Sequence, residues 1–190
     1  GYTQEGAEAL TNISGDTTIQ TSNGSLVVPQ GSELELFGPN GVLRVDGNMV
    51  NDGLVKILQL EAPTASPLTV TGTYEQLANG RLTLAYPESL EGPAPISIEG
   101  ATTLDGALEV QFVDQDVVES TSVVAILETS ALDGVFQAFI APDALPVEPF
   151  YALDGVTLQA PKAARVELLR MAVNDGTTFR HSHSAMLVGL

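Results

Sequence analysis

Short runs of strand-forming residues recur through the first third of the chain, and turn signals separate them. The four clearest runs are Ser25–Val28, Glu33–Phe37, Val42–Val45 and Leu54–Leu60. The breaks fall at residues 29–31, 38–41, 46–48 and 51–53 and consist mainly of Gly, Asn, Asp and Pro, which accept positive φ angles or begin turns. Because runs this short leave no room for helices, the sequence predicts an all-β fold.

The side chains in these runs alternate between apolar and polar. Leu34 and Leu36 fall on one face of their run, whereas Glu33 and Glu35 fall on the other. Each strand is therefore expected to bury one face and expose the other. Alternating strands at this close spacing are typical of a β-sandwich, a β-barrel or a β-solenoid.

Two stretches of sequence favour the solenoid. The phrase from Gly41 to Ile57 repeats an aliphatic run followed by Asp-Gly or Asn-Asp-Gly, and it resembles the repeats of β-helical surface proteins, including autotransporter passenger domains. The order of residues 68–84, 98–110 and 123–136 resembles a module of large secreted bacterial repeat proteins and passenger-like proteins. This resemblance covers roughly residues 40 to 142. It implies parallel β-solenoid coils, an extracellular or cell-surface location, and a scaffolding or adhesive role.

We therefore predict a right-handed parallel β-solenoid, with its coils over residues 1–142. At ~20 to 25 residues per coil, the length of the whole chain predicts roughly eight coils. An antiparallel β-sandwich is the alternative, since it fits the same alternating runs. Pro87, Pro93 and Pro95 predict a surface loop, because proline cannot donate to a central ladder. Residues 143–190 are expected to form an extended excursion and C-terminal strands on the same domain. Within them, residues 164–173 fit a strand or a helix, and we favour the strand.

The charge balance excludes several partners. The formal net charge is −17, with only seven Lys and Arg, so no basic patch is expected to neutralise nucleic-acid phosphates or anionic lipids. No apolar run reaches the ~18 to 20 residues that span a bilayer, which predicts no membrane insertion. The absence of cysteine excludes disulfides, thiolate catalysis and Cys-ligated metals.

A catalytic triad has no support in the sequence. The two histidines, His181 and His183, lie together in a polar segment, and no Gly-x-Ser-x-Gly elbow presents a nucleophile. On one strand face the two histidines could share a metal, but no further ligands stand at metal-site spacing. We therefore favour a solvated polar end and assign no metal to the two histidines. We predict no catalytic residues and no cofactor.

Calcium and sugars are the remaining ligands to consider. Turn acids that stacked coils could bring together are Asp46, Asp52, Asp105, Asp133, Asp154 and Asp175. Asp-Gly is also the ordinary chemistry of a tight turn, and the calcium-roll repeat Gly-Gly-x-Gly-x-Asp is absent, so we favour plain turns. The aromatic residues expected to be exposed for stacking on sugars are Tyr74, Tyr86, Phe150 and Tyr151.

Together these features predict a non-catalytic extracellular structural protein. We expect it to self-assemble, as a homo-oligomer or filament, into a surface fibre, sheath or matrix, because a solenoid has open ends that must be capped or joined. A carbohydrate- or calcium-dependent adhesion module is the alternative, with a surface polysaccharide as its partner.

Overall fold

The computed structural model describes residues 10–38, 40–58, 64–86, 92–112, 123–142 and 147–159, and the side chains of Ser22, Asn23 and Val123 are not described. Every regular element in these ranges is a β-strand. The all-β prediction is confirmed.

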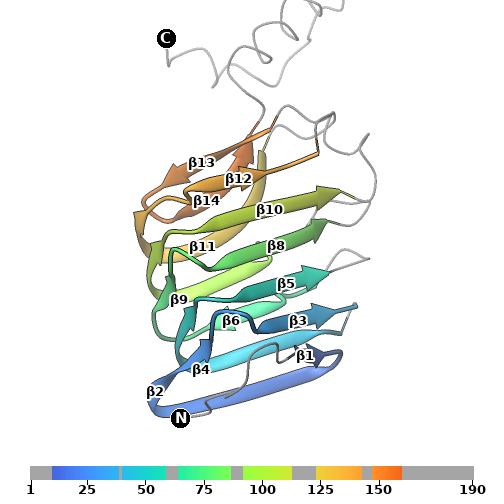
Figure 1. Ribbon diagram of the computed structural model, residues 1–190, viewed down its shortest axis with the longest axis vertical. Helices are drawn as coiled ribbons and strands as arrows, with labels where there is room; N and C mark the ends of the chain where they lie inside the picture. The colour runs from blue at the N-terminus through green and yellow to red at the C-terminus, as the bar shows by residue number, and fades with distance from the viewer. Residues whose placement is uncertain are drawn as a thin grey trace, which may run out of the picture.

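The strands form two facing sheets, and the chain passes back and forth between them along the solenoid (Figure 1). The short-strand sheet contains β1 (Leu10–Ile13), β3 (Glu33–Phe37), β5 (Leu54–Leu58), β8 (Arg81–Tyr86), β10 (Ala107–Phe112) and β12 (Ala138–Ile140), in that spatial order. The long-strand sheet contains, in spatial order, β2 (Asp16–Val28), β4 (Val42–Asn51), β6 (Leu68–Val70) with β7 (Tyr74–Gln76), β9 (Ile96–Leu104), β11 (Val123–Gly134), β14 (Gly155–Gln159) and β13 (Glu148–Ala152).

Pairing between successive coils is parallel in both sheets. Glu33 pairs with Leu54, and Leu54 pairs with Arg81, so each turn of the chain sits directly on the previous one. Through the parallel stack, strands that follow each other along the chain lie in opposite sheets, or in line within one sheet as β6 and β7 do, and not side by side. This is the topology of a parallel β-solenoid and not that of an antiparallel sandwich. The solenoid prediction is confirmed.

The core is a set of aliphatic columns that run along the solenoid. Leu36, Ile57, Leu84 and Val110 occupy one position in four successive coils, and all four are almost completely buried. Across the core, Leu43, Leu68, Ile96 and Leu127 form the facing column. Burial of each such side chain contributes about 1.5–3 kcal/mol, so these columns hold the coils together.

The solenoid has about four turns, so the expected eight coils were wrong. Glu33 and its partner Leu54 are 21 residues apart, but Leu54 and Arg81 are 27 apart, and Ala107 and Ala138 are 31 apart. The extra residues lie where a short strand leads into the next long strand, as between β5 and β6. Pro93 is exposed in one of these links, between β8 and β9, where the loop was predicted. Pro87 falls outside the described residues.

The predicted turn at residues 46–48 is instead a bend within β4, which runs unbroken from Val42 to Asn51. Gly47 has a φ of 141° there, a value that a residue with a side chain rarely adopts. Gly72 and Gly100 occupy the same bend in the next two coils, and each donates its N–H to the glycine below, with N–O distances of 2.9 and 3.1 Å. The hydrogen bonds between coils therefore continue through the bend, and the glycines stand where the backbones of neighbouring coils come close together.

The parallel stack ends at an antiparallel hairpin. β14 pairs antiparallel with β11, and β13 pairs antiparallel with β14. Leu153 and Asp154 form the two-residue turn between them. In Figure 1 this hairpin and β12 form the end of the solenoid opposite to β1 and β2. The segment preceding β13 was expected to be extended, and residues 143–146 lie outside the described part.

Candidate functional site

The described residues contain a buried polar cluster that sequence reasoning missed. Asn51 and Gln76 are the last residues of β4 and β7, at the corner where the chain leaves the long-strand sheet. Both are almost completely buried, and Asn51 Nδ2 donates to Gln76 Oε1 at 3.3 Å. The hydroxyl of Tyr74 donates to the same oxygen at 2.9 Å.

Main-chain groups satisfy the rest of this polar cluster. Asn51 Nδ2 also donates to the carbonyl of Arg81, and Asn51 Oδ1 accepts from the N–H of Gly53. Gln76 Nε2 is close to the carbonyls of Gly80, Asp105 and Ala107, at 3.0 to 3.3 Å. The cluster therefore joins three successive coils, and its amides are occupied within the protein rather than available to a ligand.

A second polar contact joins the later coils. Thr102 and Thr129 are buried, and Thr102 Oγ1 lies 2.8 Å from Thr129 Oγ1. Thr129 Oγ1 also donates to the carbonyl of Gly100, again at 2.8 Å. Like the amide cluster, this contact is internal and stabilises the stack instead of forming a binding site.

Two of the aromatic residues expected to be exposed are buried, which corrects that prediction. Tyr74 and Tyr86 are 1% and 6% exposed, and burial raises the pKa of both phenols well above the usual value. Both follow the inward alternation of their strands, which outweighs the polar tip because each hydroxyl finds an internal acceptor. Phe150 is 52% exposed, and Tyr151 is half-buried, where burial raises its pKa. A ladder of exposed aromatic rings for sugar stacking is therefore not formed by these four residues.

The turn acids are spread along the solenoid rather than gathered. Asp46 pairs with Arg44, Asp52 accepts from Asn79, and Asp105 and Asp133 each accept from the glycine that follows. Asp154 is exposed in the hairpin turn. Among the described residues, no group of three His, Asp or Glu side chains is placed to hold a metal ion. Asp175, His181 and His183 lie outside the described residues.

A depression of about 440 Å³ lies beside β3, β5 and β8. Its lining residues are Gln30, Gly31, Ser32, Glu33, Asp52, Gly53, Leu54, Asn79 and Arg81. Two of its charged groups already have partners, since Glu33 lies 2.6 Å from Lys56 and Arg81 lies 3.7 Å from Glu109. The depression offers amides, carboxylates and one guanidinium, which suit hydroxyl groups better than a strongly charged ligand.

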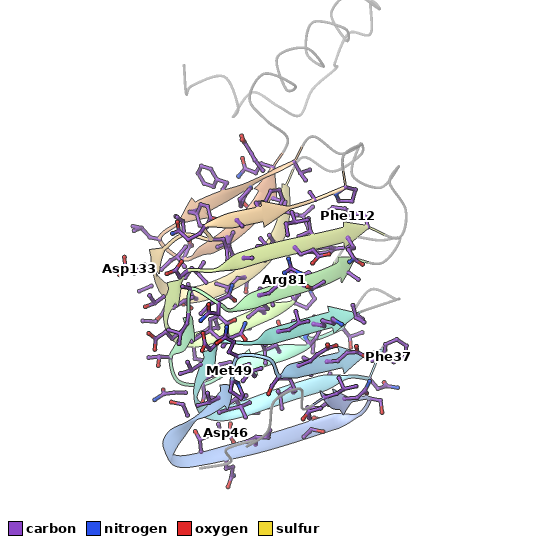
Figure 2. The ribbon with its side chains drawn as sticks, in the orientation of Figure 1. Phe37, Asp46, Met49, Arg81, Phe112 and Asp133 are labelled. Carbon is purple, nitrogen blue, oxygen red and sulfur yellow. The ribbon has the colours of Figure 1, made fainter. Side chains whose placement is uncertain are left out.

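Phe37 and Phe112, the last residues of β3 and β10, lie on one side of the solenoid, and Asp133 lies on the other (Figure 2). Arg44, Lys56 and Arg81, the described cations, all have a carboxylate within 4 Å. No helix in the described residues is long and apolar enough to cross a membrane.

The two ends of the solenoid differ in their edge strands. At the N-terminal end, β2 has 13 residues, and among the described strands it pairs with β4 alone. Residues 10–28 carry one charged side chain, Asp16. At the other end, β12 has three residues and β13 contains Pro149. Short edges and prolines are devices that block further pairing, and charged side chains are another, so the N-terminal edge is the less protected one.

Pro149 affects the outer edge of β13 for a geometric reason. A two-residue hairpin turn makes Ala152 and Gly155 a hydrogen-bonded pair, and alternate pairs along the ladder repeat that geometry. Pro149 pairs with Leu158 at a non-hydrogen-bonded position, so its nitrogen faces away from β14. The free edge of β13 therefore lacks one donor.

Comparison with protein-family models, curated proteins and solved structures finds no match for this chain. The structure thus assigns the chain to the parallel β-solenoids by its architecture alone.

Proposed function

We propose that this protein is a non-catalytic structural subunit that self-associates through the ends of its solenoid. The observation that supports this most directly is the N-terminal edge, where a 13-residue strand with one charge ends a stack of parallel coils. Such an edge presents unpaired N–H and C=O groups that can bind another strand. Its near neutrality is favourable in a protein with a net charge of −17, because two copies repel each other least there.

An extracellular or cell-surface location belongs to the same proposal. It is supported by the resemblance of residues 40–142 to passenger-like repeat modules, and by the confirmed solenoid architecture of that region. The assembled form would be a fibre, sheath or matrix whose acidic outer surface stays hydrated. An enzyme is disfavoured, because each buried polar cluster among the described residues is internally satisfied and the acids are dispersed.

The experiment is light scattering of the purified chain over a hundredfold range of concentration, followed by electron microscopy of the concentrated sample. We expect the mean mass to rise with concentration and elongated particles to appear. Adding calcium should leave the mass unchanged, since the proposed contacts are between backbones. A sample that remains monomeric throughout contradicts the proposal.

A saccharide-binding module is the second candidate, and the depression beside β3, β5 and β8 supports it. The buried Ser32 hydroxyl there has no hydrogen-bond partner among the described residues, and Asn79 and Gln30 are exposed amides. Glycan-array binding that is lost in Asn79→Ala but kept in the exposed control Gln111→Ala would favour this function over self-association.

A further inference from the structure

The C-terminal end of the solenoid is incompletely covered by the described residues. The long-strand sheet continues beyond β11 through β14 to β13, whereas the short-strand sheet stops at β12. Phe139, Ala141 and Tyr151 pack against the core there but are only partly buried. Phe150 and Ile140 on the adjoining strands are 52% and 40% exposed. Terminal coils of solenoids usually need a cap, because their apolar columns otherwise end in water.

This end is also acidic and without described cations. Glu128, Asp133, Glu148 and Asp154 lie on β11, β13 and the hairpin turn. All four are exposed, and none forms an ion pair with another described residue. No Lys or Arg occurs between Arg81 and Lys162 in the sequence, so the preceding 80 residues supply no counter-charge.

The chain that follows β14 has the opposite character. Residues 160–190 contain four of the seven Lys and Arg of the protein but only two of its 24 acids, giving +2, while residues 1–159 carry −19. Residues 164–173 contain two arginines, Arg165 and Arg170. Between residues 166 and 173 they also contain six apolar side chains, which are Val166, Leu168, Leu169, Met171, Ala172 and Val173. This segment begins five residues after Gln159, the last residue of β14, which belongs to the hairpin at the uncovered end.

We propose that residues 164–173 dock onto the C-terminal end of their own solenoid and cap it. Apolar side chains of the segment would cover Phe139 and Tyr151, and Arg165 and Arg170 would lie near the exposed acids of β11 and β13. Docking in the same chain is favoured over docking on a neighbour, because a linker of four residues holds the segment at an effective concentration of about millimolar. A four-residue linker reaches about 16 Å, which is enough to cross from one sheet to the other.

The cap would limit association at this end. If copies associate end to end, as proposed above, the segment must leave the C-terminal end before another copy can stack there. This consequence rests on the proposed function, whereas the cap itself does not. Nitroxide broadening within one chain therefore tests the cap, and light scattering separately tests self-association.

The test uses the full chain, which has no cysteine and so accepts a single label. A nitroxide at Ala172→Cys should broaden the backbone amide signals of Phe139, Ile140 and Tyr151. The amides of Leu34 and Leu36, in the second coil from the N-terminal edge, should keep their intensity and report that the fold is intact. Hydrogen exchange of the β12 amides should speed up by about tenfold when the segment is released.

Charge variants provide the matched comparison. Arg170→Glu should abolish the broadening at β12 and β13, whereas Arg180→Glu, with the same change of charge outside the docking segment, should preserve it. In a mixture of isotope-labelled chains and separate nitroxide-labelled chains, the amide signals of β12 and β13 should not be broadened, because the segment docks on its own chain. Any one of three results overturns the proposal. These are no broadening at β12 and β13 in the nitroxide-labelled parent chain, an equal loss of that broadening in the two charge variants, and broadening that arises only between different chains.

Discussion

Asn51 and Gln76 occupy the same corner position in neighbouring coils, and their side-chain amides form a hydrogen bond inside the core. The same position is apolar in the coil below, where Val28 pairs with Asn51. The polar pair therefore distinguishes one coil interface from others that are built from similar aliphatic columns. Because a shift of register would leave these amides buried without partners, the pair favours one alignment of the coils.

Removing both members of this pair should cost less than the sum of the two single removals. We expect Gln76→Leu to lower the free energy of unfolding by about 2–4 kcal/mol, because Asn51 Nδ2 and the Tyr74 hydroxyl lose an acceptor in the core. The double variant Asn51→Leu/Gln76→Leu should be less destabilised than the sum of the single variants. Urea unfolding followed by circular dichroism measures all three. Gln111→Leu, at an exposed position, is the control and should change stability by less than about 0.5 kcal/mol. Additive costs would show that the amides are not coupled.

The glycine bend gives a prediction about stacking distance. A Cβ at Gly72 would lie 2.7 Å from the carbonyl oxygen of Gly47, so Gly72→Ala must move the backbone of the neighbouring coil. We expect a loss of at least about 2 kcal/mol in the free energy of unfolding, and a lower thermal midpoint. Gly15→Ala is the matched control, because a Cβ there meets no atom within 4 Å. Equal stability of the two variants would contradict the close stacking at the bend.

Burial of tyrosine predicts how stability depends on alkaline pH. Burial raises the pKa of the Tyr86 phenol above its usual value of 10.0, so the folded protein keeps a proton that the unfolded chain loses above that pH. The free energy of unfolding should therefore be unaffected by this group below pH 10 and should decrease as the pH rises beyond it, by up to about 1.4 kcal/mol per pH unit.

The variant Tyr86→Phe isolates this contribution. It loses the hydrogen bond to the carbonyl of Ala125, which should cost about 1 kcal/mol at neutral pH. Between pH 9 and pH 11.5 its stability should decline less steeply than that of the parent chain, as measured by urea unfolding at each pH. Parallel pH profiles of the two proteins would show that Tyr86 ionises equally in the folded and unfolded states.

The proposed association through the N-terminal edge predicts a matched pair of lysine variants. Thr18 on β2 and Thr69 on β6 both pair with Arg44, on opposite sides of β4, but β2 is an edge strand and β6 is internal. Lysine on an edge strand opposes pairing with another chain. Thr18→Lys should therefore lower the association measured by light scattering by about tenfold, whereas Thr69→Lys should leave it nearly unchanged. The same response in both variants would place the contact elsewhere.

Much of the local structure followed from the sequence. Alternation at Glu33–Phe37 placed Leu34 and Leu36 in the core. The predicted breaks at 29–31 and 51–53 do separate strands, although Asn51 itself is the last residue of β4. These features depend on neighbouring residues alone, because side chains alternate with period two in any strand and turn residues act through their own φ angles.

Contacts between coils could not be derived in this way. Tyr74 and Tyr86 were expected outside but lie in the core, since their hydroxyls find acceptors that only the stacked fold supplies. Asn51 was assigned to a turn, although its amide bonds to a residue 25 positions further along the chain. A comparison of residues at the coil spacing would have aligned Asn51 with Gln76, but that spacing changes from coil to coil.

The sequence by itself determined that this chain forms short strands, each with one apolar face to bury, and that sharp turns separate them. Only the tertiary structure decided how many coils there are, which polar side chains meet inside them, and which end has the less protected edge. The physical reason is that the links between the sheets vary in length at little energetic cost, so the register of the coils is set by the burial of complete columns and by the hydrogen bonds of Asn51 and Gln76.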